Sequence, residues 1–198
     1  MNQPEIAAGA LLLRAWRRSD AAAVVQAWTD PEIRRWGRFG AELPDLAAIE
    51  QWVDWNHQQW QYGLRAGFAV CTADGEGLVG SIMLRDFARF TMPGRPGETG
   101  ETGYWIVPGH RGRGAATAAL RALTEWGFEA SEQGGLGLRR IALRHSVRNP
   151  ASCRVAEKAG FTCEGTMRES CRYADGDWHD EHLHARLFVD PPVKPPQA

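Results

Sequence analysis

An α/β domain in which helices flank a mostly antiparallel sheet is the fold class that the sequence predicts. Runs rich in β-branched and aromatic residues alternate with segments of helical periodicity. Two pairs of β-rich runs are joined around Asp-Gly dipeptides, which are typical of hairpin turns. The resulting order is one strand, two helices, three strands, a helix, a strand, a helix and two strands. That mixture is typical of a sheet with flanking helices.

The first half of the chain begins with a strand at residues 11–16, LLLRAW. A helix is expected over SDAAAVVQAW, where Ser19 or Asp20 can cap the N-terminus. A second helix fits residues 45–60, whose apolar residues recur at helical spacing. The runs GFAVCT and GLVGSIML then predict a hairpin around ADGE, and a loop rich in Gly and Pro follows at residues 86–101.

The second half continues with a strand, TGYWIV, and a helix from about residue 114 to residue 130. The next strand is RRIALRHSV. NPASCRVAEKAG predicts a helix with both ends marked, because Asn149 suits the N-cap, Pro150 the first turn and Gly160 the C-terminal cap. The last two strands, FTCEGTMRES and EHLHARLFV, are expected to meet around Asp175 and Gly176.

The bulk composition is that of an ordinary soluble protein. The 198 residues fit one domain, expected over residues 1–190, with a disordered proline-rich tail at residues 191–198. A formal net charge of −1 argues against nucleic acid as a partner. No apolar run approaches the roughly 20 residues of a membrane span. The four cysteines lack CxxC spacing and no signal peptide precedes them, so we expect a cytoplasmic protein with reduced thiols.

The stretch PGHRGRGAATAAL places two arginines and two glycines immediately before a helix. A strand, a glycine turn and a helix start form a recurrent geometry for binding phosphate through backbone N–H groups. The stretch lacks both the P-loop motif and the last glycine of the dinucleotide fingerprint. Local chemistry alone leaves two alternatives open, an anion site or an arginine-rich surface loop.

The hexapeptide RGRGAA resembles the pyrophosphate loop, R/Q-x-x-G-x-G/A, of the GNAT superfamily of acyl-CoA N-acyltransferases. GYWIVPGHRGRG, GLRRIALRHSVRNPASCRVAEKAGFTCEGTMRES and DGDWHDEHLHARL resemble the branch with the Rim-type acetyltransferases of ribosomal-protein N-termini. The resemblance covers residues 11–189. It implies the GNAT fold, with a mixed, mostly antiparallel central sheet of about six to seven strands and helices on both faces.

The resemblance also implies acetyl-CoA as co-substrate and no metal. The pyrophosphate would be held at the helix start by the loop, and backbone groups of Ile106 and Val107 would pair with the pantetheine arm and polarise the thioester. Asn149 would hydrogen-bond the same arm. The loop residues concerned are Arg111, Gly112, Arg113, Gly114, Ala115 and Ala116.

The leading candidates for proton transfer are Glu101 and Ser152, and Glu98, in the loop before the strand, is a weaker alternative to Glu101. Glu101 lies before TGYW, where the family often has an acidic residue, so it is either the base for the amine or a solvated residue at a strand start. Most relatives place a Tyr seven residues after the Asn, but this chain has Ala156 there. The Rim-type branch instead offers Ser152 as proton donor to the CoA sulfur, with helix capping as its alternative role.

The acceptor side would be shaped by tryptophans, of which Trp36 and Trp55 are the candidates for substrate contact. His184 lies where relatives often carry Tyr, so a substrate contact or a proton role is considered for it. HDEHLHAR suggests a metal, because His182 and His184 share a face of a strand. We expect no metal, since no other His or Cys cluster completes such a site.

The function implied is an N-acetyltransferase that moves an acetyl group from acetyl-CoA to a primary amine by direct attack in a ternary complex. The acceptor is either a protein N-terminus or a small molecule, and the chain is expected to be a monomer or a homodimer without membrane or nucleic-acid partners. The alternatives are a GNAT-like module that binds acyl-CoA without turnover, and transfer of another acyl group such as succinyl. Arg38, Arg85 and Arg89 could bind a second carboxylate.

Overall fold

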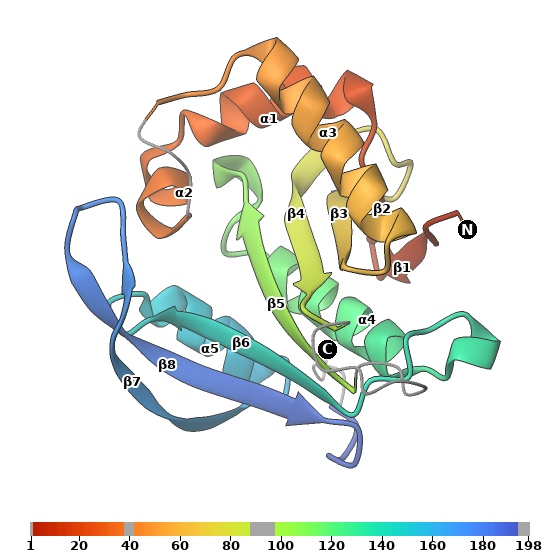
Figure 1. Cartoon of the computed structure of the whole chain (residues 1–198), viewed down its shortest axis with the longest axis vertical. Helices are drawn as coiled ribbons and strands as arrows, with labels where there is room; N and C mark the ends of the chain where they lie inside the picture. The colour runs from red at the N-terminus through yellow and green to blue at the C-terminus, as the bar shows by residue number, and fades with distance from the viewer. Residues whose placement is uncertain (1, 38–41, 88–97, 194–198) are drawn as a thin grey trace.

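The computed structural model describes residues 2–37, 42–87 and 98–193. These residues build one eight-stranded sheet in the order β1-β2-β3-β4-β5-β6-β8-β7 (Figure 1). Every neighbouring pair is antiparallel except β5 and β6. The strands are β1 Ile6–Ala8, β2 Leu11–Ala15, β3 Arg65–Thr72, β4 Leu78–Arg85, β5 Thr99–Ile106, β6 Arg140–Ser146, β7 Thr162–Arg172 and β8 Trp178–Leu187.

Helices cover both faces of this sheet, which confirms the predicted fold class (Figure 1). On one face lie α1, α2 and α3, and on the other lie α4 and α5. The strand count exceeds the expected six to seven by one, because the three-residue β1 pairs with β2 across a turn at Gly9. The helices are α1 Ala21–Trp28, α2 Pro31–Trp36, α3 Leu46–Gln61, α4 Ala115–Phe128 and α5 Pro150–Lys158.

The signals at the ends of α5 have the expected geometry. The Asn149 side chain accepts the backbone N–H of Ser152, and Pro150 occupies the first turn. Gly160 follows the helix with φ at 83°, the left-handed conformation that ends helices at little cost for glycine. The hairpin turns also form where they were predicted, with Gly75 and Gly176 at positive φ.

The short helix α2 was not among the helices that the sequence analysis predicted. Asp30 caps it by accepting the backbone N–H of Ile33, and Pro31 occupies its first turn. An Asp-Pro pair before a helical pattern is the signal that could have revealed it. Trp36 is therefore the last residue of a helix and not part of a loop.

The core has two parts, one on each face of the sheet. Against α4, buried side chains of β4 such as Ile82 and Leu84 pack on Leu120 and Leu123. On the opposite face, Trp16, Val24, Ile49 and Val53 pack against Ala69 and Cys71. Cys71 is fully buried, which fits a small packing residue. None of the helices in the described part of the chain combines the length and apolar character that crossing a membrane requires.

The parallel pair β5–β6 positions the candidate site. Residues Thr99 to Thr102 of β5 pair with Arg140 to Leu143 of β6, and the pairing stops there. Farther along, β5 pairs with β4 alone. The two strands therefore part toward their C-terminal ends, with α2 beyond the opening (Figure 1). Among the described residues, no strand covers the edge of the β5 backbone between Gly103 and Ile106 that faces away from β4, which is a place for an extended ligand.

Candidate functional site

The glycine-rich loop stands at the C-terminal end of β5, where α4 begins. Gly112 and Gly114 have φ of 73° and 82°, which other residues adopt only with strain. An added Cβ at either glycine would meet nothing within 4 Å, so the loop borders open space. The first N–H groups of α4, from Ala115 and Ala116, have no partner within the helix and carry its positive dipole end. This geometry suits an anion.

Arg111 turns its side chain toward the protein and not into the loop. Its Nε donates to the carbonyl of Ile106 at 2.9 Å, and its guanidinium pairs with Asp30 at 2.5 Å. Burial alone would raise the pKa of the Asp30 carboxyl, but hydrogen bonds from Arg111 and Ile33 outweigh it and lower that pKa. Arg111 thus anchors the loop to α2, although it is exposed like the neighbouring Arg113.

Val107 does not offer its backbone to a ligand as expected. Its N–H donates to the carbonyl of Val79 on β4, and its carbonyl accepts the N–H of His110. Successive residues of a strand direct their N–H and C=O groups to opposite edges. Those of Ile106 and Tyr104 therefore point away from β4, toward the uncovered edge of β5. Arg111 occupies the Ile106 carbonyl, so the N–H of Ile106 is the donor that faces the gap. Contrary to the expectation, both backbone groups of Val107 are therefore engaged within the protein. Ile106 keeps only its N–H for the pantetheine arm.

Tyr104 and Ser152 meet across the gap, although they lie 48 positions apart in the sequence. The two hydroxyl oxygens are 2.9 Å apart. The Ser152 hydroxyl does not cap the helix, because Asn149 does so. Burial raises the pKa of the Tyr104 hydroxyl to about 12, so it stays protonated near neutrality. Sequence analysis missed Tyr104, whose alternation with Thr102 and Ile106 along β5 places it on the face of the sheet toward α5.

Glu101 lies where β5 and β6 still pair, on the face of the sheet opposite Tyr104. Its carboxylate pairs with the guanidinium of Arg85 on β4 and, at 2.6 Å, with that of Arg144 on β6. Glu101 is therefore not a solvated residue at a strand start. Its role as base stays a prediction, and organising the two arginines is a further role that the ion pairs give it.

Arg65 adds a third guanidinium near this cluster, which sequence analysis also missed. It lies over the ring of Trp55, 5.4 Å from the centroid. Burial and, next, the charge of Arg85 lower the pKa of Arg65 to about 10. The Nε groups of Arg65, Arg85 and Arg144 are buried without a hydrogen-bond partner. Arg38 and Arg89, also considered for binding a carboxylate, lie outside the described residues.

The two tryptophans considered for substrate contact differ in their surroundings. Trp55 is 41% exposed on α3, beside Arg65. Trp36 donates to Glu32 and contacts the ring of Tyr173 from the β7–β8 hairpin, with centroids 6.1 Å apart. Trp36 therefore links α2 to the hairpin.

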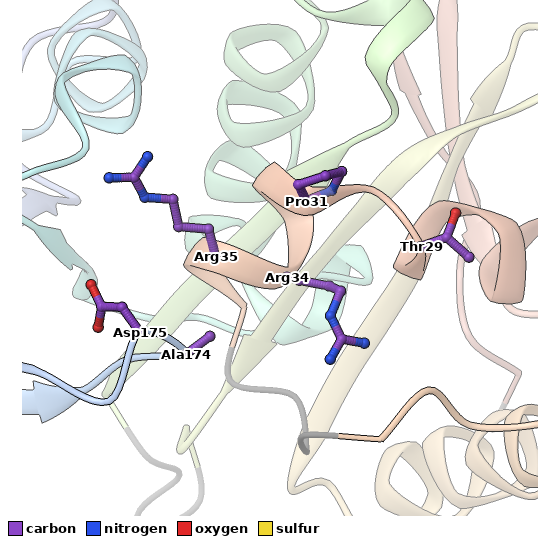
Figure 2. Close-up of a pocket in the computed structure, with 6 residues that line it drawn as sticks. All are labelled: Thr29, Pro31, Arg34, Arg35, Ala174 and Asp175. Atoms are coloured by element: carbon purple, nitrogen blue, oxygen red, sulfur yellow. The ribbon is translucent and has the colours of Figure 1, made fainter.

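A pocket of about 470 Å³ lies between α2 and the turn that joins β7 to β8. Figure 2 shows its lining from two sides of the molecule, Thr29 to Arg35 on one and the β7–β8 turn on the other. Asp30, which pairs with Arg111 of the glycine-rich loop, lies in the sequence between the lining residues Thr29 and Pro31. The lining residues are Thr29, Pro31, Arg34, Arg35, Ala174 and Asp175.

His184 is fully buried, so it does not offer a surface for substrate. It lies with His145 of β6, Cys153 of α5 and His182 of β8, and the four residues form one cluster. The sequence-based statement that no other His or Cys completes a site around His182 and His184 is therefore wrong. The fold supplies both missing members, since His145 pairs directly with His182 and α5 packs over them.

Comparisons with known proteins identify the family of the chain. Residues 10–162 match the profile of a family described as acetyltransferase (GNAT) domain. The chain is 32% identical over 123 residues to the probable N-acetyltransferase YjcK of Bacillus subtilis, covering 62% of both proteins. It is 33% identical over 91 residues to the ribosomal-protein-serine acetyltransferase of Escherichia coli, covering 46% of this chain and 48% of that protein.

These two alignments span less than two thirds of either relative. A solved structure, RimL, is described as a ribosomal L7/L12 α-N-protein acetyltransferase in complex with coenzyme A. It superposes with a TM-score of 0.77 at 22% identity, covering 93% of this chain and 98% of that one. At that identity the superposition shows a shared fold.

Proposed function

Because the chain belongs to the acetyltransferase (GNAT) domain family, we propose that it transfers an acetyl group from acetyl-CoA to a primary amine by direct attack. The observation that carries the proposal is the loop before α4, where Gly112 and Gly114 at positive φ open the helix N-terminus. The open space that a Cβ would enter fits a pyrophosphate held by backbone N–H groups. Acetyl-CoA supplies the activated acetyl group when bound.

Residues on the uncovered edge of β5 orient the donor in this proposal. The Ile106 N–H points toward the gap and is the candidate donor to the thioester oxygen, where charge develops during transfer. Asn149 uses its Oδ1 to cap α5, so its amide nitrogen, which makes no hydrogen bond within the described residues, is left to bind the pantetheine arm. The Tyr104–Ser152 pair protonates or hydrogen-bonds the leaving sulfur.

The acceptor amine approaches from the face of Glu101, opposite Tyr104 and Ser152. There Glu101 would take the amine proton, directly or through water. A protein N-terminus is the acceptor class favoured by the relatives named as ribosomal-protein acetyltransferases, and the pocket beside α2 is a candidate entry for a peptide.

The arginines beside Glu101 favour an acceptor that carries a carboxylate close to its amine. Arg65 and Arg85 hold like charges near one another, and burial deprives Arg65 of water. An anionic group between them would relieve both effects. In succinyl transfer the carboxylate would belong to the donor and not to the acceptor. Varying the acyl donor and the amine acceptor independently distinguishes these two possibilities.

Turnover is tested with the purified full chain, acetyl-CoA and a panel of amines that includes peptides with free N-termini. We expect CoA thiol release that depends on the amine, and a product heavier by one acetyl group. Reactions without protein and without amine give the background. Tight CoA binding with no release across the panel would support the alternative of a binding module.

The carboxylate preference is tested with two peptides that differ only by Asp or Asn at the second position. We expect the KM of the Asp peptide to be lower by about tenfold, the effect of one charge-assisted hydrogen bond. Arg65→Met should remove this difference, whereas Arg17→Met, on an exposed pair with Glu76, should keep it. Equal KM values for the two peptides in the unmodified protein would contradict the preference without affecting the proposed transfer.

A further inference from the structure

The cluster of His145, Cys153, His182 and His184 is not used by the proposed transfer. One potential ligand atom from each residue lies within 4.8 Å of those of the other three. The Sγ of Cys153 is 3.8 Å from the Nε2 of His184. The imidazole centroids are separated by 5.1 Å for His145–His184, 5.5 Å for His145–His182 and 6.0 Å for His182–His184.

These separations are close to those of a tetrahedral metal site. With Zn–N bonds of about 2.0 Å and a Zn–S bond of about 2.3 Å, ligand atoms lie roughly 3.5 Å apart and coordinating imidazole centroids about 5 Å apart. Only small movements of the side chains would be needed to reach them. Imidazole nitrogen and thiolate sulfur are both ligands that zinc takes in four-coordinate sites.

The hydrogen bonding of the histidines gives an independent indication. The Nε2 of His145 and the Nδ1 of His182 are buried without a hydrogen-bond partner, and the Nε2 of His184 lies beside the Cys153 thiol. Buried polar atoms are nearly always paired, so two unpaired ring nitrogens in one cluster require an explanation. The Nδ1–H of His145 donates to the Ser146 carbonyl at 2.9 Å, which leaves the lone pair of its Nε2 turned into the cluster.

The protonation states are also compatible with coordination. Burial lowers the pKa of His145 and of His184 more than their backbone hydrogen bonds with Ser146 and Phe161 raise it, which favours the neutral form of both rings. Burial and Glu157 raise the pKa of the Cys153 thiol in the absence of a metal. Coordination would therefore replace the S–H bond by a metal–sulfur bond and release that proton to solvent.

We propose that His145, Cys153, His182 and His184 bind one zinc ion in a closed, tetrahedral, structural site. The site joins β6 and β8 to α5, the helix that begins at Asn149 and carries Ser152. Half-buried His182 and Cys153 leave a path for the ion to enter. Four protein ligands fill the coordination sphere, so the zinc holds the helix on the sheet and offers no position for substrate.

A second group of possible ligands is formed by Asp175, Asp177 and His179, whose polar atoms already have partners within the protein. The Nδ1 of His179 hydrogen-bonds Ser146 and its Nε2 hydrogen-bonds Asp175. Asp177 pairs with Arg148. No unpaired ring nitrogen remains there, so the inference concerns the first cluster alone.

The test uses the full chain purified without a histidine tag. Metal content after dialysis, competition with a chromophoric chelator, and titration with Co²⁺ are measured. We expect about one zinc per chain, a Kd tighter than about 1 µM, and a sulfur-to-cobalt charge-transfer band that reports Cys153. Removing zinc should lower the Tm.

Variants separate this site from adventitious binding. Cys153→Ser should abolish the charge-transfer band and weaken zinc binding by at least about 100-fold, since losing a supporting partner alone costs about 10–100-fold. His182→Gln, at a half-buried ligand, should weaken it similarly, and circular dichroism verifies that both variants fold. Cys171→Ser, outside the cluster, should behave as the unmodified chain. A Kd weaker than about 1 µM, or unchanged affinity in both ligand variants, would overturn the proposal.

Discussion

The Gly114→Val variant is expected to lose at least about 100-fold in CoA affinity while its far-UV circular dichroism stays native. Gly114 has φ of 82° and caps α4, and a β-branched residue adopts that conformation only with strain. Relief of the strain would rotate the peptide groups that present N–H donors to a pyrophosphate. The valine side chain would also enter the open space beside the loop that the ligand needs.

Titration calorimetry with CoA measures this effect, and Gly9→Val is the matched control. Gly9 has φ of 66° and likewise nothing within 4 Å of an added Cβ, but it lies in the turn between β1 and β2. It therefore reproduces the backbone strain without touching the loop. CoA affinity that is equal in the two variants would remove the central support for a phosphate site at α4.

Tyr104→Phe and Ser152→Ala are each expected to lower kcat by about 10²–10⁴-fold with a smaller change in the KM for acetyl-CoA, as expected for groups that act when the thiolate departs. The hydroxyls are 2.9 Å apart, so either variant breaks the same pair and the double variant should be little worse than one single variant. Because the pKa of Tyr104 is raised to about 12, its loss of a proton should not limit the rate below about pH 11.

Steady-state kinetics with acetyl-CoA and a reactive amine provide the measurement. Tyr62→Phe is the control, since Tyr62 is 71% exposed at the end of α3. Multiplicative losses in the double variant would mean that the two hydroxyls act separately. Turnover near that of the unmodified chain in both single variants would leave the pair with a purely structural role.

Much of the fold could be predicted because its signals are local. Asn149, Pro150 and Gly160 mark the ends of α5 by backbone geometry that each residue favours on its own. The two Asp-Gly turns set the antiparallel hairpins in the same way. Two short elements were missed, namely β1, which has three residues, and α2, which has six residues. The outer part of the tail, residues 194–198, lies outside the described residues, so its disorder stays a prediction.

The candidate site was predicted in part. The loop glycines have the positive φ that their type suggested, and Asn149 caps the helix as expected. By contrast, the ion pairs of Glu101, the inward turn of Arg111 and the satisfied backbone of Val107 were not foreseen. Each depends on a partner from another element, so no window of neighbouring residues contains the information.

The sequence by itself determined where the glycine-rich turn and all strands and helices except β1 and α2 lie, because caps, turn residues and hydrophobic periodicity act over a few residues. Only the tertiary structure decided which side chains meet. The strand order β5-β6-β8, with α5 packed over it, brings Tyr104 to Ser152 and His145 and Cys153 to His182 and His184. Side chains on alternate strand positions face one way, but the register between strands selects their partners, and that register is set by packing of the whole sheet.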